Sequence, residues 1–438
     1  MKKLMAVLGV SMALLAGLLI YSAFELNKPE NGTQKPKVVA MVTPIAEPKA
    51  ANEQEAVSVT PISYTDEAVK DMVVSEEEEQ WDESVDENIA PSDNPYLADL
   101  VTHDDLSYAY STLNDEQKTV YDEVYRSIVS YSTNNPVSTT DPATLDKAFG
   151  CVMADHPEIF YVNGYRYTKF TTHNNVIKLL VFNASYVYSM QERDAIIPDI
   201  DAVATGILMN VYEGASDYDK IKYIYDTLVL QTEYVADSPD NQNVISVLLN
   251  KKSVCQGYAK TMQLLLNRLG IPCCLVTGIV GDSQRHAWNV VRSDGDWYYV
   301  DVTWGDASYR LDEESEGEVI VPDVNYDYLL VPYDEIAKTH RAEPVTNMPD
   351  CVSMKDNYYV REGLYFTDYN PDQLRAVFDN AYATGAGYVM LKCSDAGAYN
   401  RMCTALVDEQ KIFDYVNEGD IAYSNNDEMY KLLFALRR

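Results

Sequence analysis

The spacing of apolar residues predicts a chain that mixes helices and strands. Apolar side chains recur with helical periodicity over residues 217–232, whereas residues 159–167 and 177–188 alternate apolar and polar positions and are rich in Tyr, Val and Phe. Together with two preceding helical patterns, these strands predict a small α+β module over residues 96–200.

A second folded region, residues 201–345, contains the clearest helix pattern of the chain. Ser253 fits the N-cap of a capping box and Gln256 its third helical position, and Gly270 ends the pattern. Three strand-like runs follow, and an Asp-Gly turn signal joins the last two into a hairpin: residues 273–280, 286–292 and 297–304. After about residue 345 the strand and helix patterns restart, which predicts a separate small α/β module over residues 346–438.

The amino-terminal region has a different pattern. A basic start precedes an apolar run over residues 4–24, close to the length that spans a bilayer. We expect residues 1–24 to form an uncleaved signal anchor of a single-pass membrane protein whose bulk is extracytoplasmic; a cleaved signal and a secreted chain are the alternative. Residues 25–95 are acidic, with four successive glutamates at 76–79, and predict a disordered spacer.

Composition narrows the class of function. A formal net charge of −34 argues against nucleic acid as a partner, because phosphate backbones are bound through Lys and Arg. The seven cysteines lack zinc-ligand spacing and the sequence has no EF-hand loop, so neither a metal nor another cofactor is expected. The sequence leaves any disulfide pairing open. His103, His156 and His173 stand alone and are expected to be structural or solvated.

Cys255 is the first candidate for chemistry. It occupies the second helical position after the predicted N-cap Ser253. Unpaired N–H groups and the helix dipole favour negative charge there, so a thiol at this place is inclined to ionise. An ordinary buried cysteine would more often lie on the apolar inner face of the helix.

The expected register of the hairpin places two further candidates close together. If the turn closes at Asp-Gly, Arg292 lies opposite Trp297 and His286 lies opposite Thr303. Asp301 is then the diagonal neighbour of His286 on the same sheet face, and a slip of one residue would separate them.

These three residues have the composition of a nucleophilic triad. A thiol at a helix start, an imidazole that takes its proton and a carboxylate that orients the imidazole can attack a carbonyl carbon. Each residue also has an ordinary alternative: a small core cysteine, a strand histidine bonded to the backbone, and a solvated aspartate.

The surrounding residues resemble the transglutaminase-like superfamily over about residues 221–306, and four ordered motifs carry the resemblance: Ser253-Val254-Cys255-Gln256-Gly257-Tyr258-Ala259; Leu269-Gly270-Ile271-Pro272 followed by Val276-Thr277-Gly278; His286-Ala287-Trp288-Asn289-Val290; and Trp297-Tyr298-Tyr299-Val300-Asp301-Val302-Thr303-Trp304. One position departs from the family, since Val302 stands where many relatives have proline. The resemblance implies an α+β, papain-type core in which a helix bearing the cysteine packs on an antiparallel sheet bearing the histidine and the aspartate. The flanking modules and the anchor resemble those of bacterial cell-surface members.

The resemblance also implies roles and a reaction class. Cys255 would be the nucleophile, His286 the base and later the acid, and Asp301 the orienting carboxylate. We expect hydrolysis of an amide in a surface protein or cell-wall (peptidoglycan) peptide, as by a protease or amidase, rather than crosslinking. The candidate cleft residues are Gln256, Tyr258, Trp288 and Trp304. The alternative is a non-catalytic cell-surface binding module that retains the fold.

Overall fold

The computed structural model describes residues 37–40, 72–81, 106–281, 283–306 and 322–436. The chain divides into two compact units. The core unit comprises the described residues of Tyr64–Gly305 and Tyr328–Ser353, and the C-terminal unit comprises those of Met1–Ser63, Asp306–Asp327 and Met354–Arg438. The core unit therefore includes the predicted module over residues 96–200 and most of the one over residues 201–345, whereas Asp306–Asp327 belong to the C-terminal unit.

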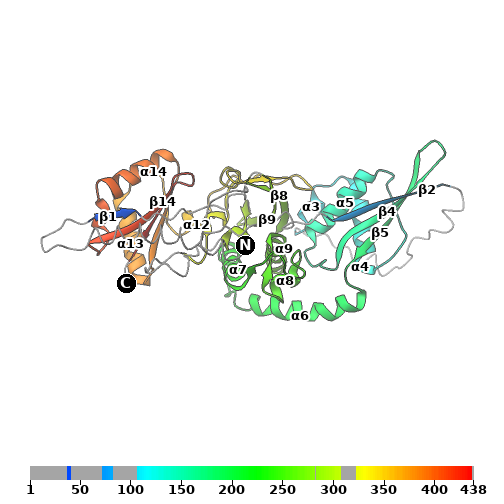
Figure 1. The fold of residues 1–438 in the computed structure, drawn as a ribbon, viewed down its shortest axis with the longest axis horizontal. Coiled ribbons are helices and arrows are strands. Elements are labelled where there is room, and N and C mark those ends of the chain that lie inside the picture. The colour runs from blue at the N-terminus through cyan, green and yellow to red at the C-terminus, as the bar shows by residue number, and fades with distance from the viewer. Residues whose placement is uncertain (1–36, 41–71, 82–105, 282, 307–321, 437–438) are drawn as a thin grey trace, which may run out of the picture. The chain divides into compact units, whose positions relative to one another are not determined.

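The first part of the core unit is a four-stranded sheet with strand order β2-β4-β5-β3 and a group of helices beside it (Figure 1). A capping box begins α4, where Asn114 and Gln117 exchange hydrogen bonds. The elements are β2 (Val73–Gln80), α3 (Tyr108–Ser111), α4 (Asp115–Ser130), β3 (Asn135–Val137), α5 (Pro142–Asp155), β4 (Val162–Thr171), β5 (Ile177–Tyr186) and α6 (Met190–Leu208).

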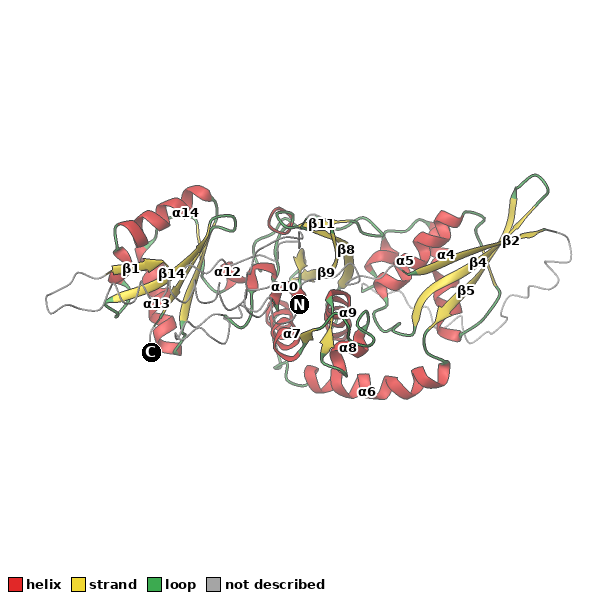
Figure 2. Cartoon of the chain, viewed as in Figure 1, coloured by secondary structure: helices red, strands yellow, loops and turns green. Residues whose placement is uncertain are grey.

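The second part of the core unit is an antiparallel sheet with strand order β10-β9-β8-β11, against which α9 packs (Figure 2). A short two-stranded sheet, β6 with β7, precedes α9. The elements are α7 (Asp217–Gln231), β6 (Glu233–Tyr234), α8 (Val244–Leu248), β7 (Lys252–Ser253), α9 (Cys255–Arg268), β8 (Cys273–Val280), β9 (Gln284–Ser293), β10 (Asp296–Val300), α10 (Val302–Gly305), α11 (Tyr333–Ile336) and β11 (His340–Ala342).

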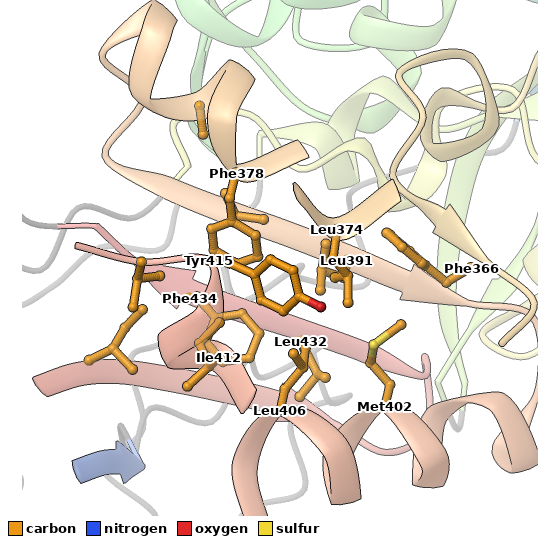
Figure 3. Close-up of a cluster of buried hydrophobic side chains, with 14 of the residues drawn as sticks. Phe366, Leu374, Phe378, Leu391, Met402, Leu406, Ile412, Tyr415, Leu432 and Phe434 are labelled. Atoms are coloured by element: carbon orange, nitrogen blue, oxygen red, sulfur yellow. The ribbon is translucent and has the colours of Figure 1, made fainter. Parts of the chain in front are cut away.

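The C-terminal unit is a five-stranded mixed sheet with strand order β1-β14-β15-β13-β12. Leu374 and Phe378 of α13 pack with Leu391, Leu432 and Phe434 of the sheet in its apolar core (Figure 3). The elements are β1 (Lys37–Ala40), α12 (Tyr358–Arg361), β12 (Tyr365–Phe366), α13 (Pro371–Thr384), β13 (Tyr388–Cys393), α14 (Ala396–Cys403), the π-helical turn η3 (Thr404–Asp408), the 3₁₀ turn η4 (Lys411–Asp414), β14 (Asp420–Asn426) and β15 (Lys431–Ala435).

The prediction of a disordered spacer over residues 25–95 is wrong for two segments, because β1 and β2 both lie inside it. The glutamates of β2 explain this, since β4 offers them partners: Glu76 pairs with Lys169 and accepts from the Tyr167 hydroxyl. A second ion pair joins Arg166 to Glu77 at 3.7 Å. The neighbouring strand therefore compensates charges that would otherwise keep the segment extended in solvent.

The predicted signal anchor, residues 4–24, lies outside the described residues. Among the described residues, no helix is both long enough and apolar enough to cross a membrane.

Candidate active site

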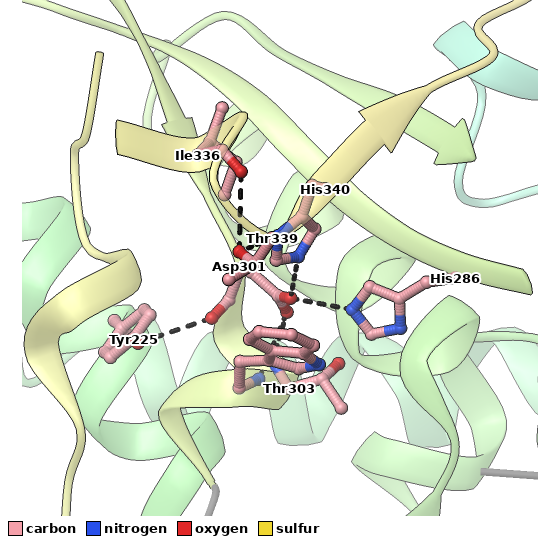
Figure 4. A network of polar contacts seen from close by, with 8 residues as sticks. Tyr225, His286, Asp301, Thr303, Ile336, Thr339 and His340 are labelled. Carbon is pink, nitrogen blue, oxygen red and sulfur yellow. Dashed lines mark hydrogen bonds and ion pairs between the residues drawn. The ribbon is translucent and has the colours of Figure 1, made fainter. Parts of the chain in front are cut away.

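Asp301 is the centre of a buried polar network in the core unit (Figure 4). It directly follows β10, and its Oδ1 accepts the backbone N–H groups of Thr303 at 2.9 Å and Trp304 at 3.1 Å. Its carbonyl oxygen accepts from the Tyr225 hydroxyl at 3.3 Å. The side chain thus caps the short helix α10 and is fixed in orientation by backbone donors.

This capping corrects the predicted strand over residues 297–304. The hairpin register is confirmed, because Arg292 pairs with Trp297 and the turn residues have positive φ. However, β10 ends at Val300, so Thr303 lies in α10 and is not the cross-strand partner of His286. The approach of Asp301 to His286 therefore comes from a helix cap and not from a diagonal strand pair.

His286, on β9, is bonded to this carboxylate. Its Nε2 lies 2.7 Å from Asp301 Oδ2, and both side chains are fully buried. The rings of Trp288 and Trp304 each have a centroid 5.9 Å from that of His286. Burial alone would lower the pKa of His286, but the charges of Asp301 and Cys255 and hydrogen bonds to both residues outweigh it and raise the pKa to about 10.

Cys255 is the first residue of α9, one position earlier than predicted. The N-cap is Val254, and the predicted capping box with Ser253 and Gln256 is wrong. The Ser253 hydroxyl is instead bonded to the Ser246 hydroxyl at 2.7 Å within the core. The electrostatic argument holds at the first position, because the N–H groups of the opening turn still point toward the thiol end of the helix.

The thiol and the imidazole are neighbours. Cys255 acts on His286 through its charge and through a side-chain hydrogen bond. Since Nε2 of His286 is engaged by Asp301, Nδ1 is the ring nitrogen left for the thiol. Cys255 is fully buried and packs against Ala259 of its own helix and against Leu275 and Ala287 of the sheet.

Two site residues were missed by the sequence reasoning. His340, on β11, places its Nε2 2.9 Å from the same Asp301 Oδ2 that His286 contacts. Tyr234, on β6, is half-buried with a buried hydroxyl; desolvation and then the neighbouring Cys255 and Asp301 raise the pKa of this hydroxyl well above its usual range. A lone histidine and a lone tyrosine carry no spacing signal that would have linked them to Cys255.

All four candidate cleft residues are buried. The Tyr258 hydroxyl donates to the Thr232 carbonyl at 3.0 Å, which is a core contact. Trp288 and Trp304 surround the two imidazoles, with centroids 4.9 Å and 4.5 Å from that of His340. A role of these four residues in a substrate cleft stays a prediction.

His286, Asp301 and His340 also form a set whose ligand atoms could hold a metal ion. The two imidazoles already satisfy Asp301 Oδ2 by hydrogen bonds at 2.7 and 2.9 Å, and all three side chains are buried. A metal ion would have to displace the protons of both hydrogen bonds and enter a fully buried site. We therefore interpret the cluster as a hydrogen-bonded network.

The seven cysteines are all free thiols, so no disulfide pairing is present. Burial raises the pKa of Cys273 and Cys274 well above the ordinary thiol value. These two thiols are therefore inert neighbours on β8 against which Cys255 can be compared.

Comparison with known proteins places the site in a family. Residues 209–302 match the Transglutaminase-like superfamily, a segment that includes Cys255, His286 and Asp301. This part of the chain is a transglutaminase-like core. The α+β fold class expected from the sequence is thereby confirmed for the core.

The transglutaminase-like core has curated and structural relatives. It is 30% identical over 109 residues to the kyphoscoliosis peptidase of Mus musculus, an alignment that covers 21% of this chain and 16% of the length of that relative. A crystal structure of a TGase aligns with a TM-score of 0.24 and 16% identity, covering 36% of this chain and 48% of that one. A putative cysteine protease from Cytophaga hutchinsonii aligns with a TM-score of 0.21 and 15% identity, covering 32% and 62%.

Proposed function

We propose that the chain is a thiol enzyme that attacks an amide carbonyl through Cys255 and hydrolyses the resulting thioester. The observation that supports this most strongly is the hydrogen bond of 2.7 Å between His286 Nε2 and Asp301 Oδ2, beside a thiol that acts on the same imidazole. One ring nitrogen thus bonds to the carboxylate and the other is left to exchange a proton with the thiol, as a nucleophilic triad requires.

The proposed reaction has two halves. In the first, the Cys255 thiolate bonds to the carbonyl carbon, and the carbon–nitrogen bond then breaks as the His286 imidazolium gives its proton to the leaving amine. In the second, neutral His286 takes a proton from water, the hydroxide adds to the thioester, and the carboxylic acid leaves as the thiol is restored. N–H groups at the start of α9 stabilise the oxyanion of both steps.

The finer parts of the proposal rest on weaker support. Hydrolysis is favoured over transfer to an amine because the mouse relative is named a peptidase. An extracytoplasmic site of action, with a surface protein or cell-wall peptide as substrate, rests on the apolar run over residues 4–24 and its basic start.

Alkylation of the full chain by iodoacetamide tests the chemistry. At pH 6.5 an ordinary thiol is only about 1% thiolate, so an activated Cys255 should react roughly 100-fold faster than Cys274. Cys274 is the matched internal control, because it is equally buried and lies on the neighbouring strand β8. Peptide mass spectrometry gives both rates, and His286→Ala should reduce the Cys255 rate to that of Cys274. Equal rates in the wild-type chain would overturn the proposal.

A second experiment separates hydrolysis from crosslinking. Candidate proteins and cell-wall peptides are incubated with the chain and a fluorescent primary amine. Hydrolysis predicts amide cleavage that needs Cys255 and no incorporation of the amine, whereas incorporation would identify an acyltransferase.

One observation favours the binding-module alternative. Cys255, His286 and Asp301 are all fully buried, so a substrate reaches the sulfur only if covering residues move. A binding module would keep this arrangement for stability alone. It predicts that Cys255 is alkylated as slowly as Cys274 under native conditions. Faster alkylation of Cys255 would then appear only after unfolding.

A further inference from the structure

The Asp301 carboxylate has more hydrogen-bond donors than a triad requires. Oδ1 accepts two backbone N–H groups, and Oδ2 accepts from the imidazoles of both His286 and His340. Burial favours the neutral carboxyl, but His286 first and His340 second hold the pKa of Asp301 below its usual range. Because an ionised carboxylate can only accept hydrogen bonds, both Nε2 atoms must carry protons.

The second imidazole has the contacts of a neutral donor. Burial is the main cause that lowers the pKa of His340, and the hydrogen bond to Asp301 opposes it without reversing it. In a neutral imidazole with a proton on Nε2, Nδ1 accepts. The Thr339 hydroxyl lies 2.7 Å from that Nδ1 and 3.4 Å from the carbonyl oxygen of Ile336 (Figure 4). Donation of its proton to the nearer Nδ1 matches a neutral His340 with its own proton on Nε2.

His340 is also held in a fixed place. Its strand β11 pairs with β8, with His340 opposite Val280. The rings of Trp288, Trp304 and Tyr328 pack around the imidazole, with centroids 4.9, 4.5 and 5.6 Å from its own. The charged or titratable groups that act on it electrostatically are Asp301 and His286. Its Nε2–H is therefore a rigid donor aimed at one oxygen.

We propose that His340 is a positioning residue of the thiol site: as a neutral imidazole it donates from Nε2 to Asp301 Oδ2 and so fixes the carboxylate orientation that His286 requires. This inference rests on the proposed function. His340 lies outside residues 209–302, the segment that matches the family. Each oxygen of the Asp301 carboxylate accepts two hydrogen bonds. Without His340, Oδ2 would keep only the hydrogen bond from His286.

Two substitutions of His340 separate positioning from packing. His340→Gln keeps an N–H donor near the place of Nε2, whereas His340→Leu keeps bulk and removes the donor. A hydrogen bond to a charged group contributes about 1.5–3 kcal/mol, so His340→Leu should slow alkylation of Cys255 at pH 6.5 by about 10- to 100-fold. His340→Gln should recover most of this rate.

The pH profile supplies the readout that a packing role would not change. In His340→Leu the pH of half-maximal alkylation should rise by about one unit, because a mispositioned imidazole ionises the thiol less effectively. Thermal unfolding of both variants shows whether the fold survives. Equal losses of rate in the Leu and Gln variants, or an unchanged pH profile in the Leu variant, would refute the inference.

A measurement on the wild-type chain keeps the inference testable even if His340→Leu does not fold. Imidazole ¹⁵N chemical shifts should show His340 neutral with its proton on Nε2 from pH 6 to 9. A doubly protonated ring or the opposite tautomer in that range would overturn the assignment. So would a stoichiometric zinc ion, bound from added Zn²⁺, that is lost in His340→Gln.

Failure of this inference and failure of the proposed function are distinguishable. If Cys255 reacts no faster than Cys274 in the wild-type chain, the proposed chemistry fails. If Cys255 is fast and His340→Leu leaves its rate and pH profile unchanged, only the positioning role fails.

Discussion

Asp301 in the core unit and Asp327 in the C-terminal unit are both buried in polar networks, and the two carboxylates have different partners. In the core unit, Asp301 Oδ2 accepts from two imidazoles. In the C-terminal unit, Asp327 pairs with the ammonium of Lys431 and accepts from the Tyr359 hydroxyl at 2.6 Å. For both carboxylates burial opposes ionisation, and the partners nevertheless hold the pKa below its usual range.

The comparison shows that a lowered carboxylate pKa does not by itself mark a site of chemistry. Imidazoles exchange protons near neutral pH, whereas the ordinary pKa values of an ammonium and a phenol lie near 10. The network of Asp301 also adjoins a thiol at a helix start. The proposed function therefore places proton transfer in the Asp301 network, and we expect Asp327 to contribute structural stabilisation.

The largest expected effect comes from removing the carboxylate charge of Asp301. Asp301→Asn should slow alkylation of Cys255 at pH 6.5 by roughly 100-fold, to the rate of an ordinary thiol, because thiolate formation then loses the support of the oriented imidazole. The cause is that an amide neither stabilises the imidazolium nor selects the correct tautomer.

Asp327→Asn is the matched control, because it makes the same chemical change in the other unit. It should leave the alkylation rate within about twofold, since this residue pairs with a lysine and not with an imidazole. A large loss of rate in this variant would contradict the division between the two centres.

The second effect is on stability. Lys431→Met should destabilise the C-terminal unit by about 3–5 kcal/mol, because it leaves the buried Asp327 without its main counter-charge. Adding Asp327→Asn should recover much of the loss. Urea unfolding followed by amide hydrogen exchange in residues 354–436 measures this effect.

Tryptophan fluorescence checks that the effect is local. All four tryptophans, Trp81, Trp288, Trp297 and Trp304, belong to the core unit. An unchanged fluorescence transition in Lys431→Met would locate the damage in the C-terminal unit, whereas a shared shift would show that the two units unfold together.

The same comparison explains what the sequence could predict. The Asp-Gly turn determined the register of Arg292 and Trp297, and the ordered motifs identified Cys255, His286 and Asp301. These features are local in sequence, or follow from a turn whose geometry is encoded by its own residues. The predicted boundaries of β5 were likewise close to those observed, because the alternation of apolar and polar residues is regular there.

The errors arose where a distant partner decided the structure. Ser253 fails as an N-cap because its hydroxyl is used by Ser246 and by the Asn241 carbonyl. His340 could not be assigned because β11 has three residues, and only its pairing with β8 brings the ring to Asp301. The strand formed by the glutamates of β2 likewise depends on Lys169 and Arg166 of β4.

The third effect is a dependence of stability on pH. His286 has a folded pKa of about 10 against an ordinary value of 6.5, so its contribution is complete below pH 6.5 and is lost as the pH rises toward 10. Cys255→Ser removes the contribution of the thiol to the raised pKa of His286 and leaves that of Asp301, so the pH range narrows; within it the unfolding free energy should fall by at most about 1.4 kcal/mol per pH unit.

Urea unfolding of the core unit at pH 6, 7, 8 and 9, followed by tryptophan fluorescence, measures the slope. Adding His286→Gln should flatten it. The Asp327 network should add no slope in this range, because a lowered carboxylate pKa gives stability that is lost only in acid. A slope that survives His286→Gln would assign the titration to another group.

The smallest effect concerns the hydroxyl behind His340. Thr339→Val removes the hydroxyl that lies 2.7 Å from His340 Nδ1 and leaves the side-chain volume nearly unchanged. The hydrogen bond from Nε2–H to Asp301 still favours the correct tautomer, so alkylation of Cys255 should slow by only about 2- to 10-fold, the range for one neutral hydrogen bond.

Thr303→Val is the control, because among the described residues the Thr303 hydroxyl has no hydrogen-bond partner. It should leave the rate unchanged, since Thr303 serves Asp301 through its backbone N–H. Equal effects of the two substitutions would mean that the Thr339 hydroxyl does not set the protonation of His340.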